Sequence, residues 1–277
     1  MQPADAKVSL FDRGYLLGDS VFETLRAYEG RIFRLARHVG MLERGAGELG
    51  IASPPASEVA AIVRATLDRS GLGDAYIRVT LSRGEGPPGL GVDGYAKPVL
   101  SVIVREFHPY PAEGYVRGIA AAVVGGRKSN TGVDPSIKTG SCVQGIVARR
   151  EAASKGALEG IQLGVDGHVV SGIVSNVFAV TGGVLRTPDT ASGCRLGVTR
   201  EALLELAGDL RIEARQERLG VSDLLEAGEV FFANTLMECL PVSVIDGSRV
   251  PDAPGPTCRR LSEAFRALVA RETHGDA

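Results

Sequence analysis

The period of the apolar residues changes within the first third of the chain, and this change constrains the fold more than any other feature. Residues 59–67 repeat apolar side chains at helical spacing, between Ser53-Pro54-Pro55 and Gly71. Residues 75–82 then alternate apolar and polar side chains, and residues 99–104 are β-branched and apolar, as in strands. An earlier helical face is formed by Leu35, Val39, Leu42, Ala46 and Leu49. These signals predict an α+β fold.

The length of 277 residues suggests two domains, at roughly 150 residues per domain. Residues 108–114 are rich in turns, and their paired X-Pro steps favour an extended connection. We therefore expect a small α/β domain at 1–108, an interdomain linker at 109–117 and a larger, β-rich domain at 118–277. Its expected strands lie at 119–124, 161–165, 173–180 and 230–233, with helices near 143–155 and 199–210.

Composition and charge exclude several classes of partner. The formal net charge is -2, so no overall basic field would attract nucleic acid or an anionic membrane. The N-terminal residues have no apolar signal region, and no apolar run is long enough to span a bilayer, so a cytoplasmic location is expected. The cysteines and histidines are too dispersed for a zinc site. A small-molecule partner is the remaining expectation.

Lys138 differs from the other four lysines in its neighbours. It lies between the apolar Ile137 and the small residues Thr139-Gly140-Ser141. A lysine that is desolvated beside apolar groups loses its proton more readily and can form a Schiff base with an aldehyde. The alternative, on composition alone, is a surface lysine ahead of a helix.

Residues 195–200 precede an apolar helical pattern and form a candidate anion site. The first backbone N–H groups of a helix, together with its dipole, favour a phosphate, and Thr199 could add a hydroxyl. Alternatively, Thr199 is an ordinary N-cap residue.

Four motifs follow one another in a fixed order along the chain. They read FDRGYLLGDSVFETLR at 11–26, IKT at 137–139, SNVF at 175–178 and GVTR at 197–200. This order resembles the fold-type IV pyridoxal-phosphate enzymes, which include branched-chain and D-amino acid aminotransferases and aminodeoxychorismate lyase. The resemblance implies a two-domain, D-amino acid aminotransferase-like fold and a homodimer. FFANTLMECLPV at 231–242 and FET at 22–24 are most similar to the aminodeoxychorismate lyase branch.

The resemblance also implies which residues bind the cofactor, pyridoxal 5'-phosphate. Lys138 would form the Schiff base with it and shuttle the proton. Val198 and Thr199 would hold its phosphate through backbone N–H groups and a hydroxyl, and Thr235 would add a second hydroxyl. Ser171 takes the position of the residue that pairs with the pyridine nitrogen.

Thr24 and Asn234 are expected to contact the substrate. Thr24 matches a small polar site residue of the lyases, and Asn234 lies within the segment most similar to that branch. The expected substrate is a small-molecule amine or amino acid.

Three positions depart from the family pattern. Met41 stands where the family has a phosphate-binding arginine, although Arg44, one helical turn further on, could reach the same anion. Ser171 replaces the glutamate that keeps the pyridine nitrogen protonated, and a hydroxyl offers only a neutral hydrogen bond. Pro88 stands where many relatives have a carboxylate-binding arginine. Recognition of the cofactor and of the substrate is therefore expected to differ from the family pattern.

Three functions are compatible with these residues. The leading interpretation is a lyase resembling aminodeoxychorismate lyase, in which Lys138 removes the ring proton and pyruvate leaves to give p-aminobenzoate. The second is a class IV aminotransferase acting on an amino acid or amine, which the loss of the glutamate at Ser171 disfavours. The third is a divergent homologue that no longer uses pyridoxal phosphate and binds another ligand.

Overall fold

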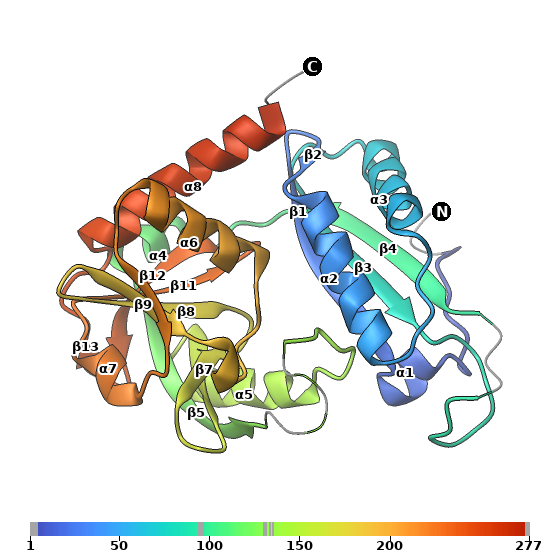
Figure 1. Ribbon diagram of the computed structural model, residues 1–277, viewed down its shortest axis with the longest axis horizontal. Coiled ribbons are helices and arrows are strands. Elements are labelled where there is room, and N and C mark those ends of the chain that lie inside the picture. The colour runs from blue at the N-terminus through green and yellow to red at the C-terminus, as the bar shows by residue number, and fades with distance from the viewer. Residues whose placement is uncertain (1–4, 94–96, 130–131, 133, 135, 275–277) are drawn as a thin grey trace. The chain divides into compact units, whose positions relative to one another are not determined.

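A computed structural model of the protein describes residues 5–93, 97–129, 132, 134 and 136–274, and the chain divides into two compact units (Figure 1). The first unit comprises Met1–Phe107 together with Ile137–Cys142. The second unit comprises His108–Ser136 and Val143–Ala277. Each unit has its own sheet and its own apolar core. The segment that contains Lys138 thus belongs to the first unit.

The first unit is an antiparallel sheet with two helices on one face. Its strand order is β2-β1-β3-β4. The strands are β1 (Ser20–Tyr28), β2 (Arg31–Ile32), β3 (Ala75–Ser82) and β4 (Val99–Glu106), and the helices are α1 (Arg13–Leu17), α2 (Leu35–Glu48) and α3 (Ala56–Ser70). The helices α2 and α3 begin and end close to the expected positions, because their apolar faces cover the sheet.

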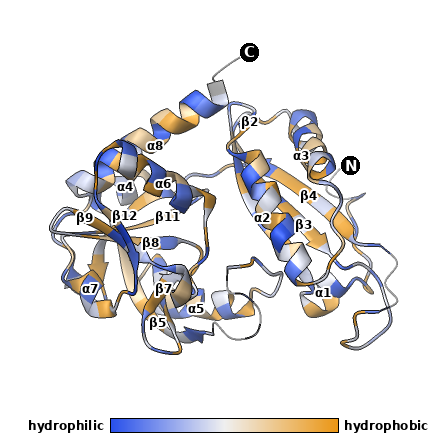
Figure 2. Cartoon of the chain, viewed as in Figure 1, coloured by the Kyte–Doolittle hydropathy of each residue, from blue (hydrophilic) through white to orange (hydrophobic). Residues whose placement is uncertain are grey.

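The core of the first unit follows the apolar periods seen in the sequence. Alternate residues of β1 and β3 are buried, and α2 presents its apolar stripe to them, with polar residues on its other side (Figure 2). Gly45 of α2 lies where a Cβ atom would come within 2.7 Å of Ile137 Cγ2. A larger residue at position 45 would displace Ile137, the neighbour of Lys138.

The second unit contains a larger mixed sheet. In the described residues its strand order is β10-β9-β8-β11-β12-β5-β6-β7, and β13 pairs with β12. Its strands are β5 (Ile119–Lys128), β6 (Glu159–Gly164), β7 (Val169–Gly172), β8 (Asn176–Thr181), β9 (Val184–Pro188), β10 (Ala214–Glu217), β11 (Glu229–Asn234), β12 (Glu238–Ile245) and β13 (Ser248–Arg249). Its helices are α4 (Ala112–Arg117), α5 (Val143–Ser154), α6 (Val198–Asp209), α7 (Val221–Leu225) and α8 (Pro256–His274).

Two expectations about local structure are corrected by this fold. The strand expected at 173–180 begins only at Asn176, because β7 ends at Gly172 and the chain turns between them. The turn is tight: a Cβ atom on Gly172 would fall 2.0 Å from Ser175 Oγ. The linker expected to be extended at 109–117 includes α4, which packs against β12. Within the described residues, no helix is long and apolar enough to cross a membrane.

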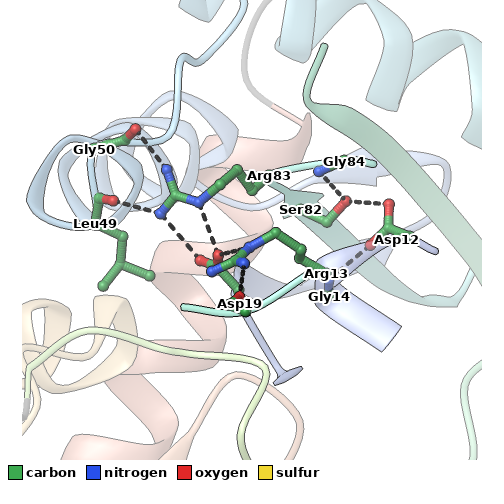
Figure 3. A network of polar contacts seen from close by, with 10 residues as sticks. Asp12, Arg13, Gly14, Asp19, Leu49, Gly50, Ser82, Arg83 and Gly84 are labelled. Atoms are coloured by element: carbon green, nitrogen blue, oxygen red, sulfur yellow. Dashed lines mark hydrogen bonds and ion pairs between the residues drawn. The ribbon is translucent and has the colours of Figure 1, made fainter. Parts of the chain in front are cut away.

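A buried polar network joins three segments of the first unit (Figure 3). The Asp19 carboxylate accepts hydrogen bonds from Arg13 Nε and Arg83 Nε, each at 2.7 Å. Arg83 also donates to the carbonyls of Leu49 and Gly50, which follow α2. This network therefore ties the segment before β1 to the end of β3 and to the end of α2.

We expect Asp19→Asn to lower the free energy of unfolding by about 3 kcal/mol, because two buried guanidinium groups lose their counter-charge. Burial alone would raise the pKa of Asp19, but Arg83 and Arg13 outweigh it and hold the pKa below its usual value. The native carboxylate therefore binds its proton more weakly than the unfolded chain does. Its contribution to stability is present above about pH 4 and is lost as the pH falls further.

Urea denaturation of the wild type and Asp19→Asn at about pH 7 and about pH 3 measures this difference. The difference in the free energy of unfolding between the wild type and Asp19→Asn should be smaller at about pH 3 than at about pH 7. Asp68→Asn, an exposed change on α3, is the control. If the difference in unfolding free energy is the same at both pH values, the charge of Asp19 does not provide the stabilisation.

Candidate active site

A buried carboxylate in the first unit holds the amine of Lys138. Lys138 Nζ lies 3.1 Å from Glu23 Oε2, and His38 Nδ1 lies 3.0 Å from the same oxygen. The side chains of Glu23 and His38 are only 7% and 2% exposed, whereas that of Lys138 is 19% exposed. The lysine side chain is thus anchored on a buried carboxylate while about a fifth of its surface stays exposed.

Local sequence places the lysine segment against β1. The backbone N–H of Phe22 donates to the Lys138 carbonyl at 2.9 Å, and that of Gly140 donates to the Ser20 carbonyl at 2.7 Å. A Cβ atom on Gly140 would lie 2.2 Å from Ser20 Oγ, so this close approach needs a glycine. Ile137 is buried in the core of the first unit. The small residues after Lys138 thus allow the segment to run beside the strand.

The pKa shifts of Glu23 and His38 depend on each other, because each of these groups faces the other and the amine of Lys138. Burial alone would raise the pKa of Glu23, but the Lys138 charge and the hydrogen bond from His38 outweigh it and hold that pKa below its usual value. Burial lowers the pKa of His38 although Glu23 opposes this shift. His38 Nε2 has no hydrogen-bond partner among the described residues, which fits a neutral ring that donates through Nδ1. Glu23 is therefore ionised and oriented by a neutral histidine.

The start of α6 in the second unit has the properties of a phosphate site. Gly197 at its N-cap has no side chain to cap the helix, so the first-turn N–H groups have no partner within the helix. Val198 and Thr199 are buried there. Asn176 Nδ2 donates to the Arg195 carbonyl at 2.7 Å and holds the segment that leads into α6. The alternative expectation that Thr199 acts as the N-cap is wrong, because the helix includes it.

Ser171 lies on β7 beside a lysine that the sequence did not mark as a site residue. Lys128 Nζ, at the end of β5, donates to Ser171 Oγ at 2.8 Å, and Ser171 Oγ donates to the Gly172 carbonyl at 2.7 Å. Burial and the nearby Arg195 lower the pKa of Lys128 to about 7. The position that a glutamate occupies in the family pattern thus holds a hydroxyl next to an amine.

Thr235 and Asn234 lie where β11 turns into β12, and Thr235 is partly exposed. Asn234 Oδ1 accepts the backbone N–H groups of Leu236 and Met237, each at 2.8 Å, and its Nδ2 donates to the Val174 carbonyl at 3.1 Å. These contacts shape the turn that presents Thr235. A substrate contact by Asn234 stays a prediction.

The other positions of interest lie on β1, on α2 and in the loop after β3. Thr24 is on the face of β1 opposite to Glu23, because successive side chains of a strand alternate. Met41 is half-buried on α2, and Arg44 is exposed on the same helix. Pro88 is exposed in the loop after β3. The substrate role expected for Thr24 also stays a prediction.

Comparison with known proteins identifies the family. The model of the family described as "Amino-transferase class IV" matches residues 20–245. The chain belongs to this family. Among curated relatives it is 36% identical to a "Putative branched-chain-amino-acid aminotransferase" of Methanocaldococcus jannaschii, covering 95% of this chain and 92% of the relative. It is 29% identical to an aminodeoxychorismate lyase of Bacillus subtilis, covering 99% and 94% of the two chains.

Solved structures of class IV enzymes are similar to the whole chain. Branched-chain amino acid aminotransferase of Escherichia coli has a TM-score of 0.92 and 31% identity, covering 100% of this chain and 94% of the other. The T.th. branched-chain enzyme, solved with pyridoxamine 5'-phosphate, has a TM-score of 0.90 and 29% identity, covering 99% and 93%. The expected family, mixed α/β fold and enzyme class are thereby confirmed.

Glu23, His38 and Lys128 were not among the site residues expected from the sequence. A signal for Glu23 was present, because alternation along β1 places it on the buried face with Val21 and Leu25. A carboxylate at such a position needs a charged or hydrogen-bonding partner. Lys128 gave no comparable signal, because its contact with Ser171 depends on how β5, β6 and β7 pair.

We expect Glu23→Gln to make the Lys138 amine react faster with acetic anhydride, by roughly tenfold. The ammonium loses the carboxylate that stabilises it, so the neutral, nucleophilic amine is more populated. Mass spectrometry of Lys138 peptides, with Lys155 as the internal reference, measures the rate. Glu48→Gln, exposed on α2, should leave it unchanged. An unchanged rate in Glu23→Gln would mean that Glu23 does not control this amine.

Proposed function

We propose that this chain is a pyridoxal-phosphate enzyme that acts at the amino-bearing carbon of an amino acid or amine, with Lys138 as its catalytic residue. The observation that carries the proposal is the amine of Lys138, held 3.1 Å from the buried Glu23 and partly exposed. Family membership and the pyridoxamine 5'-phosphate of the T.th. structure support this cofactor.

The donor groups of the chain fit the parts of this cofactor. The amine of Lys138 suits its aldehyde, and the first turn of α6 with Thr199 suits its phosphate. Thr235 would add a second hydroxyl to the phosphate. Ser171 can donate to the pyridine nitrogen, provided that this nitrogen carries no proton. Each unit thus contributes donor groups of a kind that this cofactor needs, although Met41 supplies no charge.

Residues of the protein would remove and return the proton on the amino-bearing carbon of the substrate. When bound, the cofactor supplies an aromatic ring that takes up the electrons released at the substrate carbon. Lys138 Nζ takes the proton from that carbon and returns it. Glu23 accepts a hydrogen bond from Nζ and keeps the amine in place, and His38 holds the same carboxylate oxygen. Glu23 thus connects the amine of Lys138 to the buried ring of His38.

Amino transfer is the first reaction that we propose. The lyase reaction was the leading expectation from the sequence, but the aminotransferase relative has the higher identity, 36% against 29% for the lyase. The chain is also 32% identical to the branched-chain enzyme of Escherichia coli. A small apolar amino acid is therefore the first donor substrate to test.

Elimination of pyruvate from aminodeoxychorismate is the second candidate, and Ser171 favours it. A hydroxyl in place of a carboxylate weakens the uptake of electrons by the ring. This loss affects amino transfer more, because elimination expels its leaving group quickly and here gives an aromatic product. Ser171 also contacts Lys128 rather than an acid, so its partner does not offset the loss.

We expect the protein purified with pyridoxal phosphate to show a visible absorption band that disappears in Lys138→Ala and in Lys138→Arg. Neither variant has an amine that can hold the cofactor aldehyde. Borohydride reduction should fix the cofactor on the peptide that contains Lys138, as read by mass spectrometry. Lys155→Ala is the matched control, because Lys155 lies at the end of α5 and is well exposed.

The turnover of either substrate should fall by about 10²- to 10⁴-fold in Lys138→Ala. Formation of a keto acid from a branched-chain amino acid would support amino transfer, and release of pyruvate from aminodeoxychorismate would support the lyase reaction. A protein without the visible band at saturating cofactor would refute both and favour a homologue that binds another ligand.

We also propose a homodimer. Leu10, Phe11, Tyr15 and Leu16 form an exposed apolar patch at and beside α1, each more than half exposed. A patch of this kind is usually covered by another surface. The cytoplasmic location expected from the sequence stays a prediction.

Phe11→Glu with Leu16→Asp should therefore convert a dimer into a monomer of 29.0 kDa. Light scattering coupled to size exclusion measures the mass. Val116→Asp, an equally exposed position on α4, is the control. A wild-type protein that is already monomeric would contradict the proposal.

A further inference from the structure

Lys128 lies beside the candidate site residue Ser171, and the proposed function gives it no role. Its Nζ lies 2.8 Å from Ser171 Oγ, and Ser171 is only 3% exposed. Lys128 also lines a cavity of about 190 Å³ with Asp166, Ser192, Gly193 and Arg218. Ser171 stands where the family pattern has a glutamate. A lysine amine in contact with this position was not expected from the sequence.

The contact fixes the direction in which Ser171 can donate. Because the Lys128 ammonium donates to Ser171 Oγ, the hydroxyl hydrogen must point elsewhere. In the structure it points to the Gly172 carbonyl, at 2.7 Å. A ring nitrogen that approaches Ser171 can take this hydrogen only if its lone pair is free. A protonated ring nitrogen would instead present a second donor toward the same positive charge.

The charged groups around Lys128 leave this region positive. Arg195 adds a second positive charge near Lys128. Glu159 is the nearby buried acid, but it accepts hydrogen bonds from the backbone of Gly160 and Ile173 and from Arg149. Burial raises the pKa of Glu159, although Arg149 and the backbone hydrogen bonds oppose this shift.

Asp166, the acid that lines the cavity, also has partners. Asp166 pairs with Arg218 at 2.6 Å and lies 3.3 Å from His168. Cys194 is buried, and burial raises the pKa of its thiol, so it carries no charge at neutral pH. Glu159 and Asp166 are thus each engaged by other groups of the chain.

We propose that Lys128 is a positioning residue: by donating to Ser171 Oγ it keeps the hydroxyl hydrogen turned away from itself, so that this hydrogen can pass from the Gly172 carbonyl to the pyridine nitrogen of the cofactor, and this nitrogen stays unprotonated. The inference rests on the proposed use of pyridoxal phosphate. It does not depend on which of the two reactions the enzyme catalyses. The chemical consequence is a weaker electron acceptor than one paired with a carboxylate, and therefore slower amino transfer.

The test uses the holoenzyme with the cofactor labelled with ¹⁵N in its ring, observed by NMR. The measurement starts at about pH 6, where the Lys128 ammonium predominates because the pKa of this group is lowered to about 7. The wild-type signal should have the shift of a neutral pyridine. A pyridinium shift in the wild type at this pH would overturn the proposal.

Variants separate the role of Lys128 from that of Ser171. Lys128→Met should raise the midpoint of the ring-nitrogen titration by about one pH unit, a tenfold change in proton affinity, because a nearby positive charge is lost. Lys128→Arg keeps the charge and should stay close to the wild type. Lys155→Met is the matched control. The double variant Ser171→Glu with Lys128→Met should give a pyridinium signal.

The outcomes distinguish this inference from the proposed function. An unchanged titration in Lys128→Met, with the cofactor still bound to Lys138, would overturn the role of Lys128 and leave the proposed function intact. Failure of the wild type to bind the cofactor would overturn both.

Discussion

The carboxylate of Glu23 is the constraint on which the candidate site depends. Glu23 is on the core face of β1, beside Val21 and Leu25, where an unpaired charge would be costly. Its partners, His38 and Lys138, are distant in sequence, so the chain must return to the first unit at Ile137–Cys142 to supply the second one. The same interaction that makes the buried charge tolerable therefore fixes the reactive amine.

The fold could be predicted where local periodicity and burial coincide. The alternation at 75–82 corresponds to β3, and the helical spacing at 35–49 corresponds to α2, because each element has one face on the core. The division at Gly172 was not predictable in this way, since Ile173 and Val174 read as the start of the next strand, whereas they lie in the turn between β7 and β8. The helix α4 was missed because two proline steps precede it.

The candidate site was predictable only in part, for a similar reason. Lys138 and the start of α6 are recognisable from adjacent residues, because a small-residue run and a helix N-terminus are local features. The contact between Lys128 and Ser171 depends instead on strand pairing: Lys128 is opposite Gly164, and Ser171 is opposite Gln162 on the other side of β6. Long-range register of this kind has no local signature.

The charge pattern of the chain has consequences for its chemistry. Met41 lacks a positive charge where the family pattern binds the phosphate, so in the proposed function the start of α6 with Thr199 would hold this group through N–H groups and a hydroxyl. Ser171 lacks a negative charge, and beside it lies the amine of Lys128, which is positively charged below its pKa of about 7. With the ring a weaker electron acceptor, more of the barrier to proton removal must be lowered by Lys138 itself. The pairing with the buried Glu23 fixes where this amine lies and reduces the entropy lost on reaching the substrate carbon, but it also favours the ammonium, so Nζ must give up a proton before it can act as the base.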